Sequence, residues 1–108
     1  MIYELRTYTC LPSRLPMLLR RFETDTLAIW GKHGIRPVGF WTTVIGTSNN
    51  ELIYMLAWDS LAERERKWEA FATDPQWLAA RTESEADGPL VANISSQLLK
   101  PTEFSNLR

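Results

Sequence analysis

One stretch of the sequence, LIYMLAW at residues 52–58, decides the fold. Side chains along a strand point alternately to its two faces, so this stretch presents apolar groups on both faces. Such a run is typical of a central strand that is covered on each side. The predicted strand before it, residues 36–46, is also apolar at both parities, with Phe40 on one face and Trp41 on the other. We therefore expect both faces of the sheet to be covered.

Upstream of these strands, residues 2–10 are rich in Tyr, Thr and Ile, and they predict a first strand. Apolar residues recur every three or four positions over residues 15–30, which predicts an amphipathic helix of about five turns. Ser13 is the predicted N-cap of this helix, and Gly34 suits the left-handed residue that closes many helices. Residues 46–50 predict the loop between the two central strands.

Downstream, Ser60 and Glu63 have the spacing of a capping box, which predicts the start of a second helix. Asp74 and Pro75 have the form of an N-cap and first residue of a third, shorter helix. The second helical region is thus split, and a last strand is predicted at residues 91–100.

The order β-α-β-β-α-β predicts an α+β fold of the ferredoxin-like type, with one domain over residues 1–108. Right-handed crossovers place both helical regions on one face of a four-stranded, antiparallel-type sheet. The other face is too apolar to meet water, because soluble monomers rarely expose patches of several hundred Å². The simplest cover is a second copy of the chain. We therefore expect a homodimer in which two sheets close into an α+β barrel.

Composition and charge limit the partners and the cell compartment that we expect for the protein. The formal net charge is −1, so there is no basic field to attract a nucleic acid, and we expect none as a partner. The single cysteine, Cys10, cannot form an internal disulfide. The sequence shows no signal peptide and no membrane span, so we expect a cytoplasmic protein.

Three polar residues of the first predicted strand, Glu4, Arg6 and Tyr8, share one face. If that face is buried, these groups must be paired, because an unpaired buried charge is costly. One interpretation is a structural Glu–Arg pair. The other is a polar patch in a ligand cavity, where Arg6 holds a carboxylate or enolate and Glu4 or Tyr8 moves a proton.

The only histidine, His33, lies near the end of the first predicted helix. It is either a helix-end residue that contacts the last carbonyls or a candidate general base. One His and one Cys cannot supply a closed zinc site, so we expect no metal. The five glycines form no phosphate-binding loop, and we expect no cofactor.

Several aromatic residues are candidates for stacking a ligand, although core packing also explains them. We assign ligand binding to Trp41, Tyr54 and Trp58 together with the strand residues Arg6 and Tyr8. Arg21 is left on the solvated side of the first helix, and the charged run at residues 63–67 is most simply a solvated helix face.

Five segments, taken in order, resemble the NIPSNAP family. They are residues 3–8 (YELRTY), 32–34 (KHG), 39–42 (GFWT), 58–64 (WDSLAER) and 74–77 (DPQW). The resemblance implies a dimeric α+β barrel but no agreed set of catalytic residues. The wider superfamily includes haem-degrading enzymes that use a His on the second helix, and residues 61–87 contain none.

Two functions remain open from the sequence. The first is a protein that binds, and oxidises or isomerises, a small anionic or aromatic molecule in a cavity of each protomer. The second is a non-catalytic structural or protein-interaction module in which the sheet face serves assembly.

Overall fold

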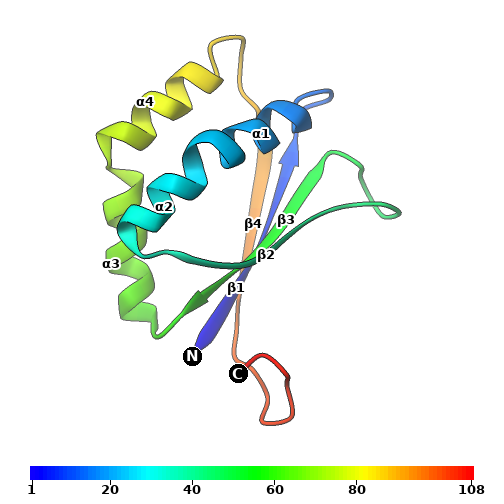
Figure 1. The fold of residues 1–108 in the computed structure, drawn as a ribbon. Helices are drawn as coiled ribbons and strands as arrows, with labels where there is room; N and C mark the ends of the chain where they lie inside the picture. Colours follow the sequence, from blue (N-terminus) through cyan, green and yellow to red (C-terminus); the bar gives the residue numbers. More distant parts are fainter.

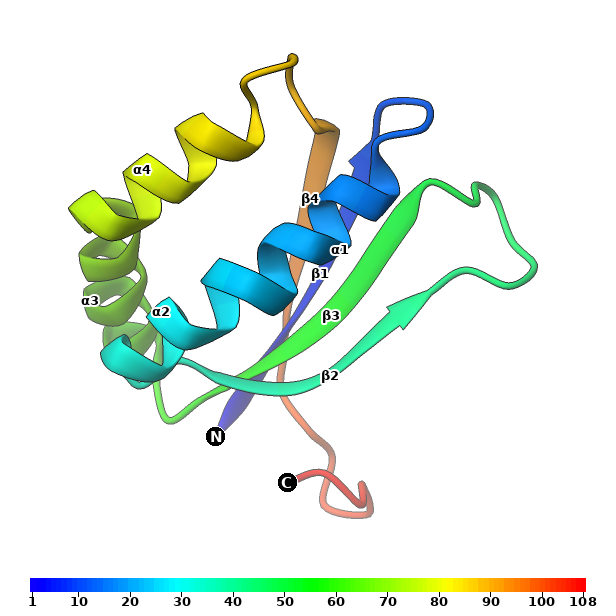
Figure 2. The same cartoon turned by 45° about the horizontal axis from the view of Figure 1, so that its top comes forward.

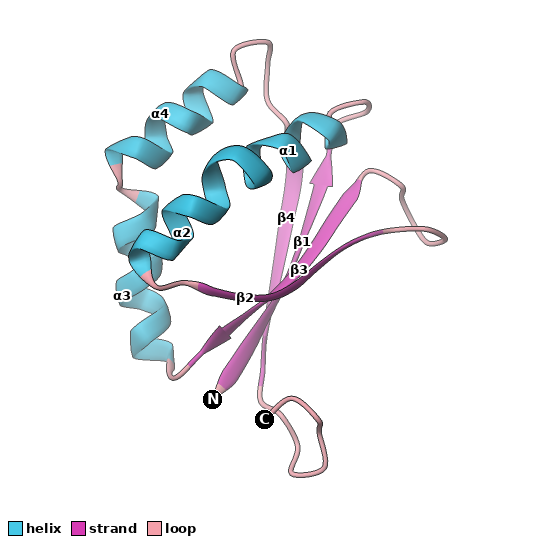
Figure 3. Ribbon diagram, in the orientation of Figure 1, coloured by secondary structure: helices cyan, strands magenta, loops and turns pink.

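A four-stranded antiparallel sheet forms the base of the molecule in the computed structural model, which describes residues 1–108. Its strands are β1 (Ile2–Cys10), β2 (Arg36–Thr42), β3 (Glu51–Trp58) and β4 (Val91–Leu99), in the order β2-β3-β1-β4. All helices lie on one side of this sheet (Figures 1 and 3). The predicted α+β, ferredoxin-like plan is confirmed.

The first helical region is continuous but not regular. It consists of α1 (Leu15–Arg21), a π-helical turn η1 (Phe22–Thr26) and α2 (Leu27–His33). The Leu27 amide donates to the carbonyl of Phe22, five residues back, which is the hydrogen bond that defines a π turn. The predicted N-cap is wrong: Ser13 has a positive φ of 68° in the preceding turn, and the N-cap position is Arg14. Gly34 does close α2 in the left-handed conformation.

The second helical region is split as predicted, into α3 (Leu61–Ala72) and α4 (Pro75–Ser84). The Ser60 hydroxyl accepts the amide of Glu63, and the Glu63 carboxylate accepts the amide of Asp59 rather than that of the cap itself. Asp74 caps α4 by accepting the amide of Gln76. None of the helices is long and apolar enough to cross a bilayer.

The second strand is shorter than predicted. It ends at Thr42, and Val44 and Ile45, which were expected within it, are exposed in the loop that extends away from the sheet (Figure 2). A register shift between Pro37 and Gly39 also interrupts its pairing with β3.

The main core lies between the sheet and the helices. Leu52, Tyr54, Leu56 and Trp58 point from β3 toward the helices and are all nearly fully buried. Trp30 on α2 lies at the centre of an aromatic cluster, in which it packs edge-on or tilted against Phe22, Tyr54 and Phe71 and stacks on Phe40. The helices therefore cover this face of the sheet completely along its central strand.

The opposite face of the sheet carries apolar residues that no helix covers. Leu5, Ile53 and Met55 lie on the two central strands and are half-buried by their neighbours. Trp41 on β2 and Leu99 on β4 extend this surface and are exposed. We call these five residues the outer apolar face.

We expect Ser60→Ala to lower the free energy of unfolding by about 1 kcal/mol, because it leaves the Glu63 amide without its cap. Urea denaturation followed by tryptophan fluorescence measures this change. Ser60→Asp restores a capping acceptor and is expected to keep the stability of the original chain. Equal stability of the Ala and Ser forms would contradict the role of this cap.

Candidate functional site

The carboxylate of Glu4, on β1, is wholly buried and accepts hydrogen bonds from four residues. Arg64 on α3 binds both oxygens, through Nε at 2.8 Å and Nη2 at 3.0 Å. The indole of Trp58 donates at 3.0 Å, the Ser96 hydroxyl at 2.5 Å and Arg6 at 3.0 Å. One carboxylate therefore connects β1, β3, β4 and α3.

This pairing keeps Glu4 ionised. Burial alone would raise the pKa of Glu4, but hydrogen bonds from Arg64, Ser96 and Arg6 outweigh that effect and hold the pKa at about 2. Two guanidinium groups face one carboxylate here, so the cluster retains a positive charge.

The Arg6 guanidinium extends the cluster toward the helices. It donates through Nε to the Tyr54 hydroxyl at 2.8 Å and through Nη2 to the Tyr8 hydroxyl at 3.3 Å. Its central carbon lies 4.5 Å from the ring centroid of Trp68, which is a cation–π distance. Together with the bond to Glu4, these two hydrogen bonds use three of the five N–H groups of the Arg6 guanidinium.

A cavity of about 430 Å³ opens beside Arg6, between the first half of β4 and the helices. This volume lies within the range typical of small-molecule sites. It is lined by Arg6 and Tyr8 of β1, by Arg21 of α1, by three residues of α3 and two of α4, and by Glu85 and residues 91–94. The α3 and α4 residues are Trp68, Phe71, Ala72, Trp77 and Arg81. The cavity thus has aromatic walls and three guanidinium groups.

Arg21 is a buried guanidinium without an ion-pair partner. It is only 6% exposed, yet it has no carboxylate within ion-pair distance. One hydrogen bond, from Nη1 to the Ser84 hydroxyl at 3.2 Å, is its single polar contact with another side chain, and Nε has no partner. Burial lowers the pKa of Arg21. Such a group is costly to bury unless an anion compensates it.

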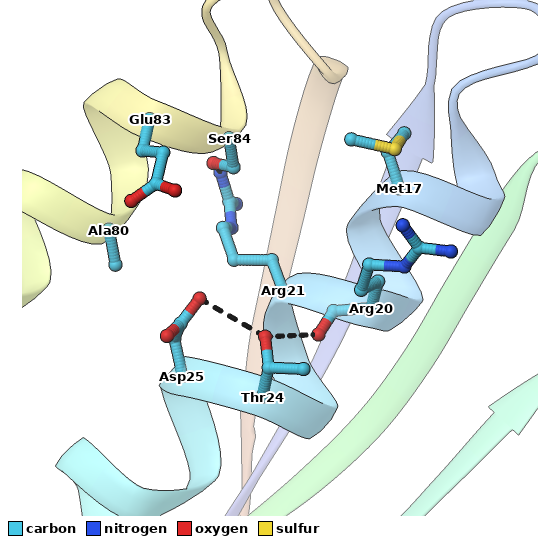
Figure 4. Close-up of a pocket in the computed structure, with 8 residues that line it drawn as sticks. All are labelled: Met17, Arg20, Arg21, Thr24, Asp25, Ala80, Glu83 and Ser84. Carbon is cyan, nitrogen blue, oxygen red and sulfur yellow. Dashed lines mark hydrogen bonds between the residues drawn. The ribbon is translucent and has the colours of Figure 1, made fainter.

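Arg21 also borders a smaller cavity of about 190 Å³ between α1, η1 and α4. Figure 4 shows its side chain extending from α1 to Ser84 on α4. On the other side of this cavity the Thr24 hydroxyl bonds to the Arg20 carbonyl and to Asp25, so these groups are already paired. The larger cavity, with its unpaired donors, is the candidate site.

The structure brings Glu4, Arg6, Tyr8 and Tyr54 together, as one of the two interpretations of the sequence requires. Only Arg6 and Tyr8 of these line the cavity. Trp58 is fully buried and does not line the cavity, and its indole N–H donates to Glu4 instead.

Two other predicted site residues lie elsewhere. Trp41 is on the outer apolar face, on the opposite side of the sheet from Arg6. His33, at the end of α2, contacts Asp74, the N-cap of α4, at 2.7 Å. This contact joins α2 to α4, and His33 does not line the cavity. Hydrogen bonds from Lys32 and His33 lower the pKa of Asp74.

Sequence reasoning missed Arg21 and Arg64, which it left on solvated helix faces. Arg64 instead reaches Glu4 from the first turn of α3. Arg21 follows the buried Leu18 by three residues and directly precedes the buried Phe22, and this spacing was the available signal for its burial.

Comparison with known proteins gives the family. The NIPSNAP family profile matches residues 3–106. The crystal structure of an uncharacterised NIPSNAP domain protein from Burkholderia xenovorans is 30% identical with a TM-score of 0.84, and the alignment covers 97% of this chain and 98% of that one. A NIPSNAP family protein of unknown function from Agrobacterium tumefaciens is also 30% identical, with a TM-score of 0.87 and coverage of 100% and 94%.

A more distant structure, of a protein from Mycobacterium tuberculosis, shares the fold at 12% identity, with a TM-score of 0.57 and coverage of 94% and 95%. Among curated proteins, no relative was found. The profile match spans nearly the whole chain and agrees with the segments quoted from the sequence. The chain therefore belongs to the NIPSNAP family.

Proposed function

We propose that the protein binds a small organic anion in the cavity between β4 and the helices. The observation that carries this proposal is Arg21, a guanidinium that is 6% exposed and lacks a carboxylate partner. A bound carboxylate or enolate would supply the missing charge and would accept from its free N–H groups.

The composition of the cavity wall supports a ligand with a flat apolar body. Trp68 and Trp77 each stack on a guanidinium, at 4.5 Å from Arg6 and 5.0 Å from Arg21. Aromatic rings held in this way offer an apolar surface beside a positive charge. The charge of the cavity wall also favours an anion. Glu85 is the one carboxylate on the wall, and it is paired with Arg81 at 3.4 Å.

We also propose that two copies of the chain associate through the outer apolar face. Leu5, Ile53 and Met55 form its centre, and contact with a second copy would remove them and Trp41 from water. A two-fold pairing of this face leaves the ligand cavity intact in each protomer, because the cavity lies on the helix side of the sheet.

A second candidate function, a non-catalytic assembly module, rests on the cluster around Glu4. Every acceptor site of this carboxylate is occupied by protein donors, so Glu4 itself is not available to a ligand. Under this alternative the cluster only holds the sheet to α3. The two functions differ in whether Arg21 binds anything, and the first experiment below distinguishes them.

Isothermal titration of the protein with 2-naphthoate and phenylacetate is expected to show saturable binding. Arg21→Met should weaken it by about 2 kcal/mol, roughly thirtyfold, since it removes a charged hydrogen-bond donor. The same variant should keep or raise the thermal unfolding temperature of the free protein, because it also removes an unpaired buried charge.

The matched control is Arg20→Met, which removes the neighbouring, exposed arginine and should leave binding unchanged. Absence of binding to any aromatic carboxylate, or equal binding by the Arg21 variant, would contradict the proposed function and favour the assembly module.

For the dimer, we expect light scattering after size exclusion to give twice the chain mass. Ile53→Glu, which places a charge at the centre of the outer apolar face, should yield a folded monomer. Leu61→Glu is the control, since Leu61 is an exposed apolar residue that lies on α3, away from this face. A dimer that survives Ile53→Glu would show that another surface mediates association.

Glu4→Gln is expected to lower the free energy of unfolding at pH 7 by about 3 kcal/mol, because it leaves Arg6 and Arg64 without their shared carboxylate. The pKa of Glu4 falls from an ordinary 4.5 to about 2 on folding. Its stabilisation is therefore complete above about pH 4.5 and is lost as the pH falls toward 2. Urea titrations of both proteins should accordingly converge near pH 2.

The exposed Glu65 provides the control, and Glu65→Gln should change stability little at any pH. A constant difference between the original chain and the Glu4 variant down to pH 2 would contradict this account.

A further inference from the structure

The hydrogen bonds of Tyr54 and Tyr8 leave one hydroxyl hydrogen without an acceptor in the protein. Tyr54 is wholly buried, and its hydroxyl accepts from Arg6 Nε at 2.8 Å. A guanidinium can only donate, so the direction of this bond is fixed. The other hydroxyl within reach is that of Tyr8, at 2.9 Å, and Tyr54 must donate its own proton to it. Burial raises the pKa of Tyr54, which keeps that proton in place.

Tyr8 is then left with an unused donor. Its oxygen accepts from Tyr54 and from Arg6 Nη2 at 3.3 Å, which fills both acceptor positions of a hydroxyl. No acceptor for its own hydrogen exists among the protein groups around it. Tyr8 is 8% exposed and lines the cavity, so this hydrogen is available to a molecule bound there.

The chain of bonds that ends at Tyr8 begins at a positive charge. Donation from Arg6, directly and through Tyr54, polarises the Tyr8 hydroxyl and strengthens it as a donor. The cavity therefore holds two different recognition groups. Arg21 attracts a full negative charge, whereas Tyr8 offers one directed hydrogen bond to a neutral or partly charged oxygen.

We infer that the ligand is an aromatic keto acid, whose carboxylate binds Arg21 and whose separate carbonyl oxygen accepts the hydrogen of Tyr8. This inference rests on the proposed anion-binding function and names its ligand class. The aromatic body packs against Trp68 and Trp77, which line the same cavity. A hydrogen bond from Tyr8 also draws electron density toward the carbonyl oxygen of the ligand, so Tyr8 is placed to stabilise its enolate form.

Matched pairs of acids that differ only in the carbonyl test the inference. Benzoylformate is compared with phenylacetate, and 4-oxo-4-phenylbutyrate with 4-phenylbutyrate, because the two pairs place the carbonyl at different distances from the carboxylate. In isothermal titration the keto acid of at least one pair should bind about three to ten times more tightly than its partner, which is the gain from one hydrogen bond.

Tyr8→Phe should abolish this preference and leave the affinity for the carbonyl-free acids within about twofold. The infrared stretch of the bound ketone should also shift to lower wavenumber in the original chain but not in this variant. Tyr3→Phe is the control, since Tyr3 is on the same strand but faces the outer side of the sheet.

The outcomes separate this inference from the function on which it rests. If none of the four acids binds, the anion site itself is refuted. If the carbonyl-free acids bind and neither keto acid gains affinity, the keto acid inference is overturned while the anion site stands. A preference that persists in Tyr8→Phe would also overturn it. Should that variant not fold, the comparison of acids on the original chain still decides.

Discussion

The structure depends on one buried carboxylate. Glu4 lies in the central strand β1, and its two oxygens accept from the neighbouring strands and from α3 at once. A buried carboxylate is costly in isolation, so its presence requires Arg6 and Arg64 to be where they are. This requirement fixes the distance between the sheet and α3. Because Trp68, Phe71 and Ala72 of α3 line the cavity beside Arg6, the same bonds also hold one wall of that cavity in place.

The two faces of the sheet separate two tasks. The helix-facing side concentrates the polar groups of β1, which bond to one another, and two of them, Arg6 and Tyr8, line the cavity. The outer apolar face carries almost no charge and is suited to contact with another apolar surface. Because side chains alternate along a strand, a sequence of nine residues serves both faces without conflict.

The sequence predicts the framework well because the framework follows from periodicity. Strand alternation at residues 52–58 and the capping residues Ser60 and Asp74 are local signals, and the structure confirms the elements that they mark. The end of β2 was wrongly placed, since Val44 and Ile45 are apolar but lie in an exposed loop. Composition alone cannot distinguish a strand residue from an apolar residue on a loop.

The candidate site was predicted in part. Arg6, Tyr8 and Tyr54 share a face by parity, which a sequence reveals. The contributions of Arg21 and Arg64 depend on how far long side chains reach between elements, which the pattern of residues does not give. For Arg21 there is a further cause, because the π turn changes the face on which the residues before it lie.

Because of that π turn, the orientation of Arg21 depends on the number of residues in this helix as well as on their identity. Each residue of a regular α-helix advances about 100° around the axis. An uninterrupted helix that kept Thr26 and Trp30 in the core would therefore rotate Arg21 by roughly that angle, away from the cavity. A relative that lacks one residue between Arg21 and Leu27 would instead form a regular helix and keep this arginine on the same side, because a π turn accommodates one extra residue. The π turn thus lets this helix carry one residue more than a regular helix would and still direct both Arg21 and Trp30 toward the interior.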